Sequence, residues 1–330
     1  MIDFRYHLVS LIAVFLAIAL GIVIGTTQLN GPVLTNLQDQ VSALQTDKRL
    51  LEDETQSLQT QLDGQGGFAE QVGPALVAVT LTGRRVLLVV TDDGVEADVL
   101  DEVSTLLDAA GGTVTGTLAL DPAYTSPESA SDLQAYVTGP GLPPGVTLPE
   151  TDDTGELVAG LLAQVLVVPP GTDGEPDAAP DSTPDTAPDT APDAAAASSV
   201  VAGLSALGVL RQESSSLTPA DHVVLLTAGA LTGDDAADRN AVLVQLATAL
   251  DQQGSGAVIA GDAASAGDGG LVAAVSGDTT ASAAISTVDN VTTPEGVIST
   301  VLALPTEGQG TSGKYGTGED AQPVPPVPSP

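Results

Sequence analysis

The side chains best placed for chemistry in this sequence are carboxylates that follow apolar runs. Asp92 and Asp93 follow the apolar residues 86–90 after Thr91, and Asp262 follows a second run at 256–260. If both runs are parallel strands, their carboxyl ends meet at one edge of a sheet, where carboxylate oxygens can bind a hard cation. Asp is also an ordinary turn and helix-capping residue at such ends. Asp92 and Asp93 are therefore a candidate metal site, with a purely structural role as the alternative.

Other reactive side chains are scarce. The 330 residues include no cysteine, one methionine, and histidine only at His7 and His222. This composition excludes disulfides, thiolate nucleophiles, cysteine zinc sites and the soft ligands that copper(I) prefers. Residues 308–314 have the spacing of a phosphate-binding loop, but Tyr315 replaces the serine or threonine that would bind magnesium. We therefore expect that the protein is not an enzyme.

The charge balance is strongly acidic. Eight Lys and Arg residues against 43 Asp and Glu residues give a formal net charge of -35. Such a surface repels nucleic acid, and the absence of tryptophan removes one base-stacking residue. We expect no nucleic-acid partner.

An apolar segment near the start of the chain predicts a membrane helix. Residues 8–24 contain one polar side chain, Ser10, and span about 26 Å as a helix, near the short limit for crossing a bilayer. Arg5 precedes the segment, and no Lys or Arg follows until Lys48. This asymmetry predicts a single-pass protein of the cell membrane with a cytoplasmic N-terminus and its main domain outside the cytoplasm.

Two other interpretations of this segment remain open. Ala17-Ile18-Ala19 resembles a signal-peptide cleavage site, but the apolar run continues past it to Ile24. A buried helix of a soluble protein would need apolar neighbours, and the flanking sequence is polar. We favour a retained anchor, for which membrane lipid is a partner.

Small residues recur at every fourth position of the apolar segment. They are Ala13, Ala17, Gly21 and Gly25. This spacing places them on one helix face, as in membrane helices that pack closely against each other.

Heptads of apolar residues follow a turn expected at Asn30-Gly31-Pro32. The predicted coiled-coil core consists of Leu34, Leu37, Val41, Leu44, Leu51, Leu58 and Leu62. Leucine at every d position indicates a helix that pairs with another, and Lys48 at an a position favours a parallel dimer over larger assemblies. The alternative is an amphipathic helix that folds back on its own domain. Gly64, Gly66 and Gly67 are expected to end the helix.

The rest of the chain alternates between strand and helix patterns. Strands are predicted at 84–90, 113–120, 221–227, 256–260 and 284–288, and helices at 96–110, 156–166, 236–250, 271–275 and 293–304. The continuous apolar strands are typical of parallel sheets buried on both faces. We expect an α/β fold in which a doubly wound, mainly parallel sheet follows the membrane helix and coiled coil.

A repeat interrupts this pattern. Pro-Asp recurs at 176, 180, 184, 188 and 192, in a stretch too poor in large apolar residues to fold, which predicts a disordered insertion. The predicted segments are 1–27 (stub and membrane helix), 28–66 (coiled coil), 67–168 (first part of the domain), 169–199 (insertion), 200–306 (second part) and 307–330 (Gly- and Pro-rich tail).

The first 25 residues, MIDFRYHLVSLIAVFLAIALGIVIG, resemble the start of the actinobacterial copper transport protein B (MctB) family. Val288-Asp289-Asn290-Val291 and Tyr315-Gly316-Thr317-Gly318 are similar to stretches near the family's C-terminal end. The resemblance implies a cell-envelope protein of copper homeostasis that acts in efflux or transport, with copper as the implied ion. Self-association, as a homodimer or a larger assembly, and contacts with other envelope proteins are expected. An envelope scaffold that moves no ion is the alternative.

Overall fold

The computed structural model describes residues 4–170 and 193–326, without the side chains of residues 26–35. It consists of two compact units, Met1–Gln65 and Gly66–Pro330. Most of the predicted Pro-Asp insertion, residues 171–192, lies outside the described residues.

Helix α1 (Phe4–Val77) runs without a break from the apolar segment into the second unit. The turn expected at Asn30-Gly31-Pro32 is therefore wrong, and so is the helix end expected at Gly64, Gly66 and Gly67. A single proline or glycine costs a helix interior about 1–3 kcal/mol, but the apolar positions before and after each interruption favour one continuous helix.

The predicted mainly parallel α/β fold is confirmed in the second unit. A seven-stranded sheet has the order β3-β2-β1-β4-β5-β6-β7, and only β3 is antiparallel to its neighbour. The strands are β1 (Arg85–Val90), β2 (Thr113–Leu120), β3 (Leu210–Gln212), β4 (His222–Thr227), β5 (Ala257–Gly261), β6 (Ser286–Val288) and β7 (Lys314–Tyr315). The chain order reverses between β1 and β4, which is the position where doubly wound sheets commonly bind ligands.

Side chains of the central strands alternate between two hydrophobic cores. In β1, Leu87 and Val89 belong to one core, and Val86 and Leu88 belong to the other. All six residues of β4 are buried. Both faces of the sheet therefore need a layer of helices.

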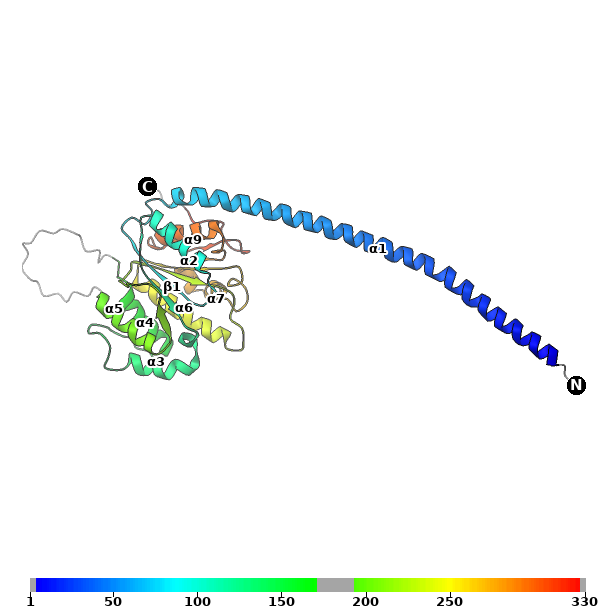
Figure 1. Cartoon of the computed structure of the whole chain (residues 1–330). Helices are drawn as coiled ribbons and strands as arrows, with labels where there is room; N and C mark the ends of the chain where they lie inside the picture. The colour runs from blue at the N-terminus through cyan, green and yellow to red at the C-terminus, as the bar shows by residue number, and fades with distance from the viewer. Residues whose placement is uncertain (1–3, 171–192, 327–330) are drawn as a thin grey trace, which may run out of the picture. The chain divides into compact units, whose positions relative to one another are not determined.

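Helices of the second unit supply these two layers (Figure 1). One core includes residues of α3 (Ala130–Val137), α4 (Thr154–Leu166), α5 (Ala194–Ala206), α6 (Ala236–Gln253), α7 (Leu271–Gly277) and α8 (Ala281–Ala284). The other includes residues of α2 (Ala97–Ala109), α9 (Pro294–Glu307) and the end of α1. Two 3-10 helices, η1 (Pro122–Thr125) and η2 (Pro127–Ser129), follow β2.

Several short elements differ from the sequence prediction. β3 and β7 add two strands at the edges of the sheet, and α3 was not expected. α5 begins at Ala194, inside the range predicted as disordered, because Val200, Val201 and Leu204 are buried against the sheet. β6 begins at Ser286, two residues later than expected.

The end of α1, which belongs to the second unit, packs closely against α9 and the core beneath it. A Cβ atom added at Gly73 would lie 3.0 Å from Cδ1 of Ile298 in α9, and Val77 is fully buried. Val79, just past the helix, has φ of +61° and is the one described residue other than glycine with a positive φ. This left-handed conformation is costly for a β-branched side chain.

Replacing Val79 with glycine should raise the free energy of unfolding by up to about 1 kcal/mol, since glycine removes the strain but loses more chain entropy on folding. Thermal and denaturant unfolding of the full chain in detergent would measure the change. Val79→Ala is the matched control, because it removes the exposed side chain but keeps a Cβ atom. Equal stability of the two variants would show that Val79 is not strained.

Candidate functional site

Asp92 lies at the carboxyl end of β1, at the position where the strand order reverses. Its Oδ2 accepts hydrogen bonds from the backbone N–H of Ala228 (3.0 Å) and the hydroxyl of Thr227 (3.3 Å), just beyond the neighbouring β4. Its Oδ1 accepts from the N–H of Gly94 (2.8 Å). The half-buried carboxylate therefore joins the loops that follow β1 and β4.

Asp93 faces a different partner. Its Oδ1 accepts from Nη2 of Arg211 in β3 at 3.0 Å, and the same guanidinium bonds Asp121 and Glu213. Asp93 is exposed, so solvent screens this ion pair.

The two carboxylates of the predicted metal site thus make separate sets of contacts. Among the residues that the structure describes, no three His, Cys, Asp or Glu side chains are grouped as a metal site requires. Asp92 and Asp93 as metal ligands stay a prediction, and the contacts of Asp92 fit the structural alternative.

Two more aspartates at this edge accept backbone hydrogen bonds. Oδ1 of Asp262, after β5, accepts from the N–H of Gly229 (2.9 Å) and of Ser265 (2.8 Å). Asp289, after β6, accepts from the N–H groups of Thr317 (2.7 Å) and Gly318 (2.8 Å). Each aspartate holds its own loop to the loop of a neighbouring strand, β4 for Asp262 and β7 for Asp289.

The opposite, amino-terminal edge of the sheet holds buried ionisable groups that the sequence analysis did not single out. Asp221 accepts from the N–H of Arg85 (2.8 Å) and forms an ion pair with the Arg85 guanidinium (2.7 Å). Burial alone would raise the pKa of Asp221, but the hydrogen bonds and charge of Arg85 hold that pKa below its ordinary value. In the sequence, Asp221 precedes one apolar run and Arg85 opens another, and this pattern could have indicated the pair.

Asp251 and Glu307 act in the same way at the next two strands. Asp251 accepts from the N–H of Ala257 (3.0 Å), the first residue of β5, and Glu307 accepts from the N–H of Ser286, the first residue of β6. Burial raises the pKa of Glu307 to about 8, and the nearby Asp251 carboxylate adds to the effect. Nothing in the local sequence predicts this, because Glu307 simply ends a helix.

His222 begins β4 beside a hollow of about 320 Å³, whose wall also includes Arg84, Ser255 and Gln309. The imidazole is buried, and its Nδ1 has no hydrogen-bond partner among the described residues. Burial, together with the charge of Arg84, lowers the pKa of His222 to about 4, so the ring is neutral at neutral pH. A neutral imidazole can bind a metal, but a single one beside a guanidinium is a poor cation site.

The residues predicted for association lie on α1. Ala13 and Ala17 are exposed, and a Cβ atom added at Gly21 or Gly25 would meet nothing within 4 Å. Of the predicted coiled-coil core, Leu37, Val41, Leu44, Leu51, Leu58 and Leu62 are all exposed. The side chain of Leu34 lies outside the described residues. These positions share a helix, but the structure shows no partner for them in the described part of the chain.

Comparisons with known proteins connect the chain to one family. Residues 1–326 match the family model described as "Copper transport outer membrane protein, MctB". Relatives named "Copper transporter MctB" in Mycobacterium tuberculosis (strain H37Rv) and Mycobacterium bovis are 33% identical over 268 residues, 81% of this chain and 80% of each relative. A relative of the same name in Mycobacterium leprae is 31% identical over 272 residues, with the same coverage.

Asp92→Ala should lower the free energy of unfolding by about 1–3 kcal/mol, because it leaves the half-buried N–H of Ala228 without an acceptor. Asp93→Ala should cost less than about 1 kcal/mol, since it breaks an exposed ion pair. Denaturant unfolding of both variants checks this, and calorimetry with Mn²⁺ and Cu²⁺ checks the metal hypothesis. Metal binding that both substitutions abolish would contradict the structural role.

Glu307 should make stability depend on pH. Its pKa is about 8 in the folded chain and ordinarily 4.5, so its contribution is complete below pH 4.5 and is lost as the pH rises through 8. His222 acts in the opposite sense below pH 6.5, so the measurement belongs above that value. Melting temperatures from pH 6.5 to 8.5 should fall less steeply for Glu307→Gln than for the natural chain.

The exposed loop residue Glu150 provides the control for this experiment, because Glu150→Gln removes one carboxylate without touching the sheet. It should leave the slope unchanged. Parallel slopes for all three proteins would mean that Glu307 is charged in the folded state.

Proposed function

The chain belongs to the MctB family, and from this membership we propose that it is a cell-envelope protein of copper homeostasis that acts in copper efflux or transport. The match over residues 1–326 and the relatives named copper transporters support this proposal. The residues of α1 support two further proposals, one on anchoring in the membrane and one on the assembly of copies.

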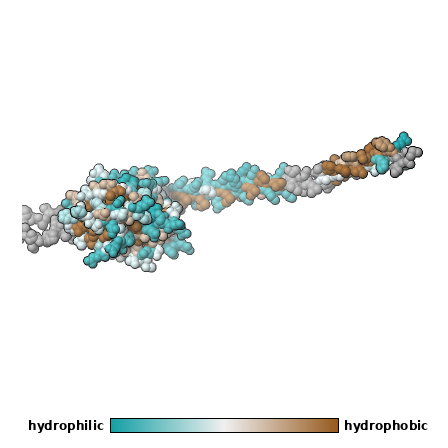
Figure 2. Space-filling view, turned by 90° about the horizontal axis from the view of Figure 1, so that it is seen from below, coloured by the Kyte–Doolittle hydropathy of each residue, from teal (hydrophilic) through white to brown (hydrophobic). Residues whose placement is uncertain are grey.

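We propose a single-pass anchor at the start of α1. Phe4–Gly25 is long and apolar enough to cross a membrane, and none of it is buried within the protein (Figure 2). Its exposed apolar side chains would be costly in water and favourable in lipid. Arg5 on one side and the lack of Lys or Arg until Lys48 on the other favour a cytoplasmic N-terminus.

Two features of α1 support an assembly of several copies. The small residues Ala13, Ala17, Gly21 and Gly25 offer a face for close helix packing within the membrane. The heptad positions of residues 37–62 offer a leucine seam; Leu44, for example, is 67% exposed. A second copy is the partner that matches this seam, because an identical helix anchored in the same membrane carries the same spacing and direction.

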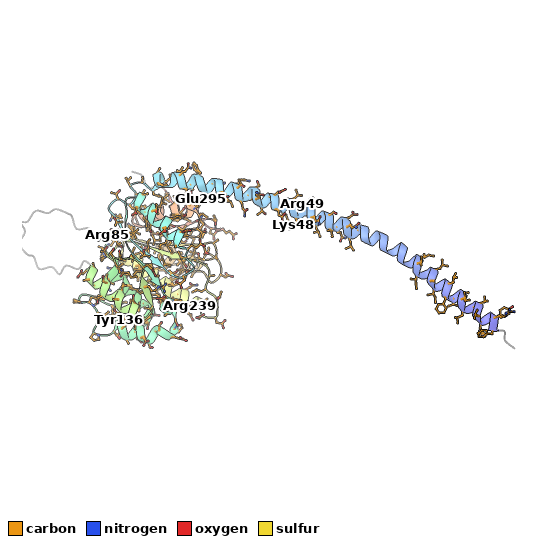
Figure 3. All side chains as sticks on the ribbon, viewed as in Figure 1. Lys48, Arg49, Arg85, Tyr136, Arg239 and Glu295 are labelled. Atoms are coloured by element: carbon orange, nitrogen blue, oxygen red, sulfur yellow. The ribbon has the colours of Figure 1, made fainter. Side chains whose placement is uncertain are left out.

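Charges along the seam favour a parallel dimer. Lys48 (labelled in Figure 3) occupies an a position of the heptads. Its Nζ lies 3.2 Å from Oε1 of Glu52. In a parallel dimer, the heptad places Asp47 and Glu52 of both copies around the two Lys48 side chains. The ammonium groups then offset carboxylates that would otherwise repel each other.

Assembly of several copies would also explain how a protein with few copper ligands can take part in copper transport. The sequence has no cysteine and two histidines, and the described residues hold no cluster of three metal-binding side chains. Both faces of the described sheet are packed with helices, so neither face is left to line a channel. A route for copper would therefore need several copies or other envelope proteins.

The same scarcity of ligands supports a second candidate function. An envelope scaffold would use the membrane helix, the seam and the acidic domain for association alone and would need no copper ligand. The two candidates differ in whether copper handling by the cell depends on the protein.

Deletion of the gene should increase copper sensitivity and cellular copper content, and the natural chain should restore both. Leu44→Asp with Leu58→Asp should fail to restore them, because charges in the seam prevent pairing. Ser42→Asp with Ser57→Asp adds the same charge to the same helix outside the seam and should restore them. Growth curves with graded copper and metal analysis of washed cells measure the outcome.

Unchanged copper sensitivity and copper content in the deletion strain would exclude the copper role and leave the scaffold. If the seam variant restores copper sensitivity and copper content to natural values, the copper role does not require the dimer.

A further inference from the structure

The last turns of α1, inside the second unit, carry an apolar face that the domain does not cover. Phe68, Val72 and Leu76 are four residues apart and so lie on one side of the helix. Phe68 is 69% exposed, Leu76 is 40% exposed, and Val72 is partly exposed. The adjacent side of the helix, with Ala69 and Val77, packs into the core with α2 and α9. We call Phe68, Val72 and Leu76 the terminal face.

The terminal face lies in a neutral stretch of a very acidic chain. From residue 64 to residue 83 the only charged side chain is Glu70. Glu70 is two residues from Phe68, about 200° around the helix, and so points away from the terminal face. Elsewhere the net charge of -35 makes two copies repel each other. Within α1, the terminal face therefore brings no carboxylate of its own to a second copy.

The terminal face also keeps the heptad register of the leucine seam. Counting on from Leu58 at d and Leu62 at a, the next positions are Gln65 at d and Ala69 at a, followed by Val72 at d and Leu76 at a. Gln65 is polar and Ala69 packs on the domain's own core, so Val72 and Leu76 are the apolar positions left for a partner. The glycines at 64, 66 and 67 do not end α1, so no break resets this register. A seam expected to end at residue 66 therefore has two further apolar positions within the second unit.

We propose that the terminal face binds the same face of a second copy, so that the α/β domains take part in the dimer and not the leucine seam alone. This inference rests on the proposed parallel dimer and adds a contact to it. In a parallel, in-register pair, Val72 faces Val72 and Leu76 faces Leu76, as equivalent a and d positions do. Phe68, at the flanking g position, covers the edge of this contact and becomes buried.

Single cysteines test the proposal directly, because the natural chain has none. Leu37→Cys reports on the leucine seam, Leu76→Cys on the terminal face, and Leu207→Cys, an exposed leucine after α5, is the control. Each full-length variant is treated in membranes with a short dimaleimide, and dimers are counted on a denaturing gel. We expect crosslinked dimers from Leu37→Cys and Leu76→Cys and none from Leu207→Cys.

The possible results separate the terminal face from the seam. Crosslinking through Leu37→Cys without Leu76→Cys would overturn the terminal contact and leave the parallel dimer standing. If neither cysteine variant crosslinks, both the terminal contact and the parallel dimer are overturned. A partner of different sequence on this face would give the same result. Crosslinking through Leu76→Cys alone would support the terminal contact and exclude the seam.

A charge on the terminal face provides a second measurement. Phe68→Glu should weaken self-association of the detergent-solubilised full chain by about tenfold or more, since it removes one large apolar side chain from the interface and adds like charges. Leu207→Glu adds the same charge at an exposed leucine elsewhere and should change the dissociation constant little. Circular dichroism confirms that both variants fold, and equal dissociation constants in folded variants would overturn the proposal.

Discussion

The structure depends on a parallel sheet whose central strands are buried on both faces. Every side chain of β4 is buried, and β1 sends alternate side chains into two separate cores. One face is covered by α4, α5 and α6, which the chain between β2 and β5 supplies. The other face needs more than α2 and α9, and the end of α1 completes it with Val77. The helix that begins with the apolar segment Phe4–Gly25 is thus also a structural part of the α/β core.

A second constraint is the shortage of positive charge. With eight Lys and Arg residues for 43 acids, most carboxylates cannot form ion pairs. Asp92, Asp262 and Asp289 at one edge of the sheet, and Asp251 and Glu307 at the other, instead accept backbone N–H groups. Asp221 accepts a backbone N–H and also pairs with Arg85. Hydrogen bonds from N–H groups stabilise a carboxylate without a counter-ion, although at Glu307 burial outweighs this effect and raises the pKa to about 8. An acidic loop at a strand end therefore carries structural information here, even where its sequence resembles a metal site.

The sequence predicts the sheet well where burial dominates the pattern. β1, β2, β4 and β5 were expected within one or two residues. β1, β4 and β5 are short apolar runs between turn residues, which are typical of buried strands, and β2 is rich in Thr, Val and Leu. β3 and β7 have three and two residues and no comparable pattern. The glycines near the end of α1 were misleading, since helix propensity is local whereas the packing of Gly73 against Ile298 is not. At the candidate site, the sequence singled out Asp92 as a metal ligand, but its hydrogen-bond partners Thr227 and Ala228 lie more than a hundred residues away and leave no local signal.

The two edges of the sheet limit how copies can associate. β3 at one edge and β7 at the other offer only a few backbone groups each, and each carries a basic residue, Arg211 or Lys314. Tyr315 in β7 is further occupied by a bridge to Gln322. Short, charged edge strands discourage strand-to-strand addition of another molecule. If copies are anchored side by side in a membrane, as proposed, such edges would prevent them from growing open-ended fibres through their sheets.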